Sequence, residues 1–156
     1  TNQTGLRLVA VGDRALYSNT AGYNVAVGSF ALYSNTTGVA NLAIGTYWDG
    51  VVSGPLYSNT TGQQNVAVGN GVLTGNVSGS YNTGIGVLAL NANTADNNTA
   101  VGYYAGYANT SGVQNTAVGV VALTSNTTGA YNSALGALAL DQLTSGNSNT
   151  AIGMYA

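Results

Sequence analysis

The side chains that could do acid–base, nucleophilic or metal chemistry are few. Apart from the tyrosines, the titratable side chains are two arginines and four aspartates, and the chain contains no His, Cys, Glu or Lys. The aspartates, Asp13, Asp49, Asp96 and Asp141, are far apart in the sequence. Most catalytic roles therefore have no candidate side chain, and zinc has no usual ligand set. We expect no enzyme activity, no catalytic residue, no metal site and no cofactor.

The low charge also excludes some partners. Charged residues are 4% of the chain, where about a quarter is typical. Nucleic-acid binding needs several cations that neutralise phosphates, and a polybasic membrane patch needs a similar cluster. No apolar run is long enough to span a membrane. We therefore expect no nucleic-acid partner and no membrane insertion.

Small and apolar residues recur with a period of about 17 residues. Each copy contains a triplet such as Ala-Val-Gly, and its glycine is called the anchor glycine below. Successive anchors are 16 or 17 residues apart, with one spacing of 24. A fixed period of this length is typical of solenoids. The anchors are Gly12, Gly28, Gly45, Gly69, Gly86, Gly102, Gly119, Gly136 and Gly153.

Other positions of the repeat are equally regular. Val, Ile or Leu precedes every anchor, and Ala precedes that residue in all copies but one. Leu stands four places after most anchors. Asn stands four places before eight of the anchors, as Asn24, Asn41, Asn65, Asn82, Asn98, Asn115, Asn132 and Asn149.

This unit predicts one coil of a parallel β-solenoid. It is too short for two helices and their turns, and frequent Gly and Asn disfavour helix. "NTAVG" indicates a short strand, "xxAL" a second extended piece, and "SNTTG" a turn in which Asn and Gly tolerate left-handed backbone. We predict an all-β, single-domain solenoid of about nine coils over residues 1–156. Coils stacked roughly 4.8 Å apart give a rod on the order of 40 Å long.

Alternation decides which side chains share a face. In Asn-Thr-Ala-Val-Gly, Thr and Val point one way, and Asn and Ala the other. We expect the Val/Ile/Leu and Leu positions to fill the interior, and the Asn position to form a hydrogen-bonded ladder. The Ala position then lies outside, where it packs against sister chains. The alternative is a narrow solenoid in which Ala fits a cramped interior corner.

The repeats also resemble a known family. "NTAVG", "NVAVG" and "NTAIG", recurring with "AL" and "NTTG", are similar to the head repeats of YadA-like trimeric autotransporter adhesins, and to related repeats of phage tail fibres and bacterial surface fibres. The resemblance covers essentially the whole chain. It implies a left-handed β-roll, three chains side by side, and a non-enzymatic role outside the cell, at a cell or virion surface. It transfers no functional residue, because the shared motif is scaffold.

Departures from the repeat are the candidate contact sites. The insertion at about residues 46–55 holds the only Trp and the only Pro, and Tyr47, Trp48 and Asp49 could contact a host surface or glycan. The alternative is a loop that covers apolar surface or packs on a neighbouring chain. A second candidate is a Tyr column, which either stabilises the stack or binds sugars or another chain. Its members are Tyr17, Tyr33, Tyr57 and Tyr107.

Three functions remain open. The leading hypothesis is a structural subunit or segment of an extracellular fibre, filament or adhesin head. The second is a tail-fibre or adhesin module that binds a host glycan, and the third is ice binding by Thr on a flat face. Because the repeat frame nearly continues when residue 156 is joined to residue 1, copies could also stack head to tail. The alternative is a segment of a longer solenoid.

Overall fold

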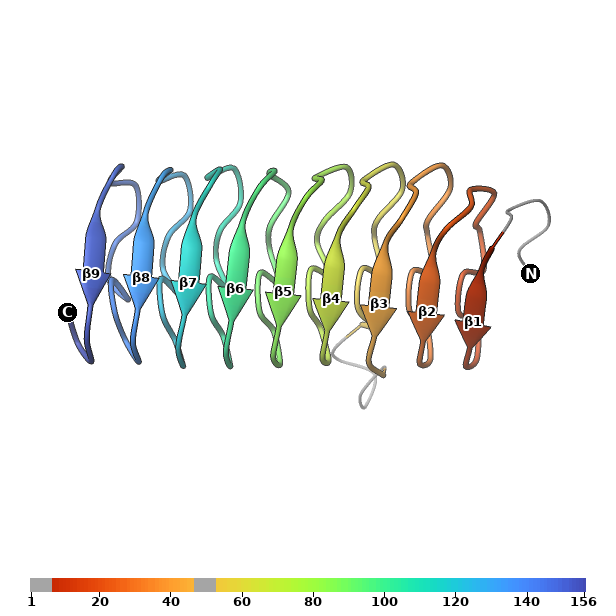
Figure 1. Cartoon of the computed structure of the whole chain (residues 1–156), viewed down its shortest axis with the longest axis horizontal. Helices are drawn as coiled ribbons and strands as arrows, with labels where there is room; N and C mark the ends of the chain where they lie inside the picture. The colour runs from red at the N-terminus through yellow and green to blue at the C-terminus, as the bar shows by residue number, and fades with distance from the viewer. Residues whose placement is uncertain (1–6, 47–52) are drawn as a thin grey trace.

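The computed structural model describes residues 7–46 and 53–156, and over these residues the chain winds into a rod of stacked coils (Figure 1). Each described coil contributes one strand of three residues, which ends immediately before its anchor glycine. The strands are β1 (Val9–Val11), β2 (Val25–Val27), β3 (Leu42–Ile44), β4 (Val66–Val68), β5 (Thr83–Ile85), β6 (Thr99–Val101), β7 (Thr116–Val118), β8 (Ser133–Leu135) and β9 (Thr150–Ile152).

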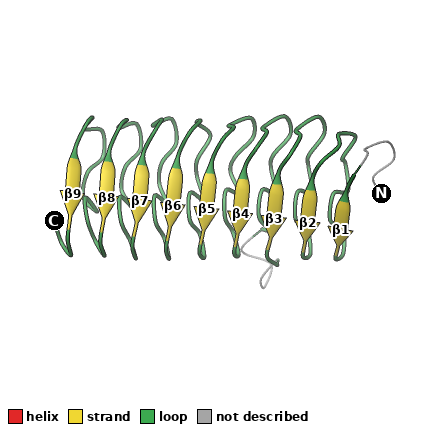
Figure 2. Cartoon of the chain, in the orientation of Figure 1, coloured by secondary structure: helices red, strands yellow, loops and turns green. Residues whose placement is uncertain are grey.

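The strands form one parallel sheet in chain order from β1 to β9. Equivalent residues pair without slippage, so that Ala26 lies beside Ala43 and Ala43 beside Ala67. Eight connections join the nine described strands and make about eight complete turns. The described part of the chain contains strands and loops but no helix (Figure 2). The prediction of an all-β parallel solenoid is confirmed.

The predicted second strand is wrong. The residues after most anchors form consecutive turns, in which the second and fourth positions have positive φ, for example Val121 at 61° and Leu123 at 52°. This left-handed backbone directs amide groups along the rod, so that Leu123 N–H donates to Ala139 O at 2.9 Å. Neighbouring coils are therefore hydrogen-bonded on this side of the rod although its described residues form no strand. This side faces the strands across the interior and is called the opposite wall. Left-handed backbone costs a Leu roughly 1–2 kcal/mol, which burial of its side chain offsets by about 1.5–3 kcal/mol.

The assignment of inside and outside on the strand side is also wrong. The Ala of the triplet is buried in the inner coils, as at Ala26, Ala43 and Ala67, whereas Val11, Ile44 and Leu135 are exposed. Alternation was predicted correctly, but the Ala side faces inward. The reason is width: the Leu of the opposite wall, such as Leu56 and Leu73, is fully buried and fills the space between the walls. Only a small side chain fits opposite it, as the narrow-solenoid alternative proposed.

One pair of residues shows how tightly the width is fixed. Val72 stands where most coils have a buried Ala, and Gly84 of β5 stands where most strands have Ala. A Cβ on Gly84 would lie 2.5 Å from Cγ1 of Val72, which is closer than carbon atoms approach. The extra volume of Val72 on one wall is thus matched by the missing methyl group of Gly84 on the other.

The predicted Asn ladder is confirmed. Asn41 N–H donates to Oδ1 of Asn24 at 2.9 Å, and the same bond recurs coil by coil up to Asn149. The side-chain amide of each Asn binds a turn carbonyl, such as Gly62 O for Asn41 at 2.9 Å. All these side chains except that of Asn149 are buried, and their bonds satisfy polar groups that would otherwise destabilise the interior. This set is called the strand-side ladder.

A second ladder of buried Asn was not predicted, because its sequence pattern indicates only a turn. Neighbouring members bond side chain to side chain between coils, as Asn59 Nδ2 does to Asn35 Oδ1 at 2.7 Å, except that Asn93 Nδ2 donates to Ala95 O instead of to Asn76. Oδ1 of Asn76 and of Asn126 are buried without a hydrogen-bond partner. Leu143 follows Asn126 in the ladder and has no polar group to offer. The members of this turn-side ladder are Asn19, Asn35, Asn59, Asn76, Asn93, Asn109 and Asn126.

Candidate functional site

The outer side of the nine described strands is a candidate contact surface, called the strand face. Its central column is the residue before each anchor glycine, which is Val, Ile or Leu in every coil. Five of its nine members are exposed, among them Leu135 at 51% and Ile152 at 72%, and the other four are half-buried. Contiguous exposed apolar side chains on a soluble protein mark interaction sites. The central column is Val11, Val27, Ile44, Val68, Ile85, Val101, Val118, Leu135 and Ile152.

A second column lies at the amino ends of the strands, three places before each anchor, and is called the amino column. It is apolar in β1 to β4 and carries hydroxyl groups from β5 onward. The apolar members are Val9, Val25, Leu42 and Val66, and the hydroxyl members are Thr83, Thr99, Thr116, Ser133 and Thr150. The Thr positions considered for ice binding therefore do lie on the outer face, but they cover only part of its length.

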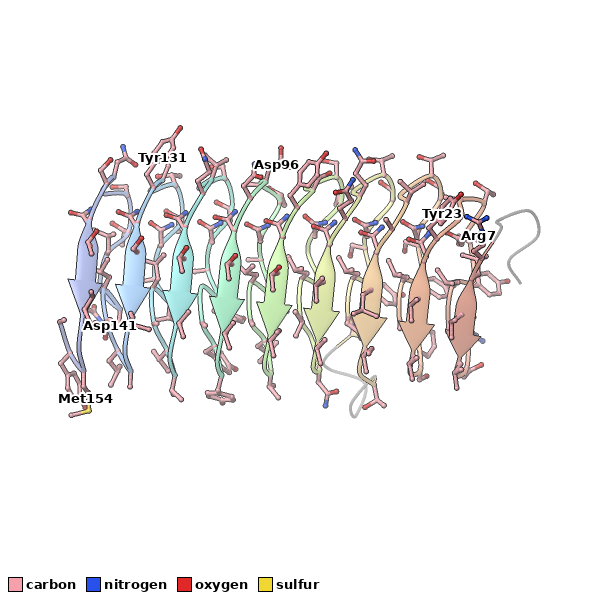
Figure 3. The ribbon with its side chains drawn as sticks, in the orientation of Figure 1. Arg7, Tyr23, Asp96, Tyr131, Asp141 and Met154 are labelled. Carbon is pink, nitrogen blue, oxygen red and sulfur yellow. The ribbon has the colours of Figure 1, made fainter. Side chains whose placement is uncertain are left out.

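A third column follows the anchors at the carboxyl ends of the strands and is called the carboxyl column. Figure 3 shows Met154 at this end, whereas Tyr131 lies beyond the amino ends. Tyr103, Val120 and Met154 are exposed. The carboxyl column is polar in its first four members, Asp13, Ser29, Thr46 and Asn70, and apolar in the next five, Val87, Tyr103, Val120, Ala137 and Met154.

The Tyr column is a stack of rings where it is continuous. The Tyr17 and Tyr33 ring centroids are 5.2 Å apart with 11° between planes, and those of Tyr33 and Tyr57 are 5.1 Å apart with 8°. Phe30 packs at a tilt against Tyr33 and Tyr57. The predicted stacking is confirmed for these three tyrosines. Both faces of the Tyr33 ring are covered by neighbouring rings, so this ring has no open face on which a sugar could stack.

Tyr107 belongs to a separate cluster. Its ring centroid is 4.8 Å from that of Tyr104, which is 4.5 Å from that of Tyr103, and both pairs are tilted. Partial burial, together with the neighbouring phenols of Tyr103 and Tyr107, raises the pKa of Tyr104 above its ordinary value of 10.0.

Alkaline pH is expected to destabilise the chain partly through Tyr104. The pKa of Tyr104 is higher in the folded than in the unfolded chain. Its contribution to the free energy of unfolding is therefore fully present below pH 10.0, the ordinary pKa of tyrosine, and is lost as the pH rises through the folded-state pKa. Tyr104→Phe should show a smaller loss of stability above pH 10 and should lack the phenol with the raised pKa in an ultraviolet titration. Tyr131→Phe, at an exposed turn, is the control. Identical titrations for both variants would contradict the assignment.

The charged side chains are dispersed. Oδ1 of Asp96 accepts from the Ser80 backbone N–H at 2.7 Å, and Oδ2 of Asp141 accepts from Gln142 at 3.0 Å. The Arg7 guanidinium lies 5.4 Å from the Tyr23 ring centroid. Within residues 7–46 and 53–156 no three His, Cys, Asp or Glu residues gather where they could hold a metal ion. The same residues include no helix capable of crossing a membrane.

The candidate contact loop at Tyr47, Trp48 and Asp49 lies outside the described residues. The contact surface that the structure adds is the Val/Ile/Leu column of the strand face, which sequence reasoning had placed in the interior. The signal that could have identified its exposure is the bulky Leu on the opposite wall. Comparisons with protein-family models, with curated proteins and with solved structures found no significant match.

Proposed function

We propose that this chain is a non-enzymatic structural protein, a rigid solenoid rod whose copies associate side by side through the strand face. The observation that carries the proposal is the central column, an unbroken line of Val, Ile and Leu on the outside of a parallel sheet. Parallel sheets are usually covered on both faces. The inner face is covered by the opposite wall of the coil, and a neighbouring copy would cover the outer one.

The area suits such an association. Eight spacings of about 4.8 Å and a width of about four residues give a flat area of roughly 500 Å² per copy. Two copies would bury roughly 1,000 Å² together, which is near the lower bound for a specific interface. A partner with the same coil spacing can match the columns along their whole length, and another copy of this chain has that spacing.

The biological setting in this proposal is an extracellular fibre, filament or adhesin head at a cell or virion surface. The similarity of the repeats to YadA-like head repeats supports it, and left-handed winding and three-fold association are part of the same proposal. Head-to-tail stacking and the binding of a host glycan stay predictions. Rods with regular hydrogen-bonded coils, as seen here, are suited to spanning distance without a hinge.

Ile85→Asp should separate the copies. It places a charge on the exposed central column, where burial by a neighbour would cost several kcal/mol, so the dissociation constant should rise at least about tenfold. Sedimentation velocity at micromolar concentration measures the change, and circular dichroism checks the fold. Asn97→Asp adds the same charge at an exposed turn and should leave association unchanged. A wild-type chain that sediments as a monomer would overturn the proposal.

A further inference from the structure

The apolar surface changes sides part-way along the rod. From β1 to β4 the amino column is apolar and the carboxyl column polar, as Val25 and Ser29 illustrate. From β5 to β9 the order is reversed, as Thr116 and Val120 illustrate. The central column is apolar in both parts. Apolar side chains therefore form one stripe that starts toward the amino ends of the strands and finishes toward their carboxyl ends.

Both flanking columns change at the same place, between β4 and β5. The amino column passes from Val66 to Thr83, and the carboxyl column passes from Asn70 to Val87. Random substitution would let the two columns change independently. A single line of contact that crosses the face obliquely requires both changes together. From β5 onward such a line leaves the amino column, whose side chains become solvated, and reaches the carboxyl column, whose side chains become buried.

We infer that copies of this chain pack along the oblique stripe and wind around one another rather than lying straight. This inference rests on the proposed side-by-side association and specifies its geometry. The partner that covers the stripe is a second copy, oriented parallel and in register, because a shared axis then meets the stripe at the same column in every copy.

The tilt follows from the strand dimensions. The middle of the stripe moves by about two residues, or roughly 7 Å, between the two halves, whose centres are roughly 20 Å apart along the rod. Aligning the stripes of neighbouring copies therefore tilts each rod by on the order of 10–20° against the common axis. A hydrophobic line that shifts steadily around a helix imposes a supercoil in the same way.

Single cysteines provide a test, because the natural chain contains none. Val25→Cys and Ser29→Cys sit at opposite ends of β2, and Thr116→Cys and Val120→Cys at opposite ends of β7. A disulfide between copies needs Cβ atoms about 3.5–4.5 Å apart. Each variant is oxidised as the assembled chain, and cross-linked dimers are counted on a non-reducing gel. Val118→Cys, in the central column, reports whether copies meet at the strand face at all.

Winding predicts cross-linking at Val25→Cys and Val120→Cys that exceeds that at Ser29→Cys and Thr116→Cys by at least about fivefold, given the short reach of a disulfide. Equal yields at Val25→Cys and Thr116→Cys, with Val118→Cys also linked, would mean a straight contact and would overturn the winding while leaving the association intact. Absence of cross-links in all variants, with monomeric sedimentation, would overturn the proposed function itself.

Discussion

Gly119→Ala is expected to break the contact between β7 and β8 and to cost about 4 kcal/mol or more in the free energy of unfolding. Gly119 has φ +136°, a conformation that side chains rarely adopt, and a Cβ there would overlap the carbonyl oxygen of Gly136 and lie 2.9 Å from Ala137 N. Coils cannot move apart to relieve the overlap without losing the bond from Gly136 N–H to Val118 O at 2.8 Å. Urea unfolding followed by circular dichroism measures the loss.

Gly153→Ala is the matched control. Its φ is +125°, but a Cβ there would meet nothing closer than 3.9 Å, at Ala156. Only the backbone strain remains, so we expect a cost of about 1–3 kcal/mol. The difference between the two variants isolates the contact between coils. Equal losses would show that backbone strain, and not the close approach of the coils, explains the anchor glycines.

Asn115→Ala is expected to destabilise the chain by about 2–4 kcal/mol. Oδ1 of Asn115 accepts from the Asn132 backbone N–H at 3.0 Å, and its Nδ2 donates to Gly129 O at 2.8 Å. The substitution leaves the Asn132 N–H buried without that partner and opens a small cavity. Gly129 O keeps the hydrogen bond that it accepts from Asn126 at 2.9 Å. Most of the expected loss in stability therefore comes from the unpaired N–H of Asn132.

Gln114→Ala is the comparison for Asn115→Ala, because Gln114 is adjacent but exposed. It should change stability by no more than about 0.5 kcal/mol. Denaturant midpoints of both variants decide the outcome. If the two midpoints coincide, the side-chain hydrogen bonds of the strand-side ladder add no stability to that given by the backbone hydrogen bonds between coils. A transition in two steps for Asn115→Ala would show that coils on either side of the break unfold separately, as stacked repeats can.

The sequence by itself determined the architecture of this protein. A period of about 17 residues with few exceptions predicted one coil per repeat, and identical residues at equal spacing predicted in-register parallel strands. The Asn ladder and the stacked rings of Tyr17, Tyr33 and Tyr57 followed from the same regularity. These features depend on neighbouring coils being alike, which is a property that the sequence displays directly.

The tertiary structure decided which side of each strand is the interior. Alternation pairs Ala with Asn and Thr with Val, but the same alternation is compatible with either side facing inward. The opposite wall settles the matter: a fully buried Leu, such as Leu56, occupies the width of the coil and leaves room only for Ala and Asn. Val and Ile are therefore displaced to the outer face, where they form the candidate contact surface.

The left-handed residues were likewise decided by the fold. Nothing local favours positive φ at Leu123 or Val121, and a β-branched residue disfavours it. The conformation arises because each coil must direct its amide groups to the carbonyl groups of the next coil, 16 or 17 residues away for most coils. Local propensity fixed the turns that Gly and Asn prefer, whereas the stacking of coils fixed the rest of the backbone and, with it, the surface that faces a partner.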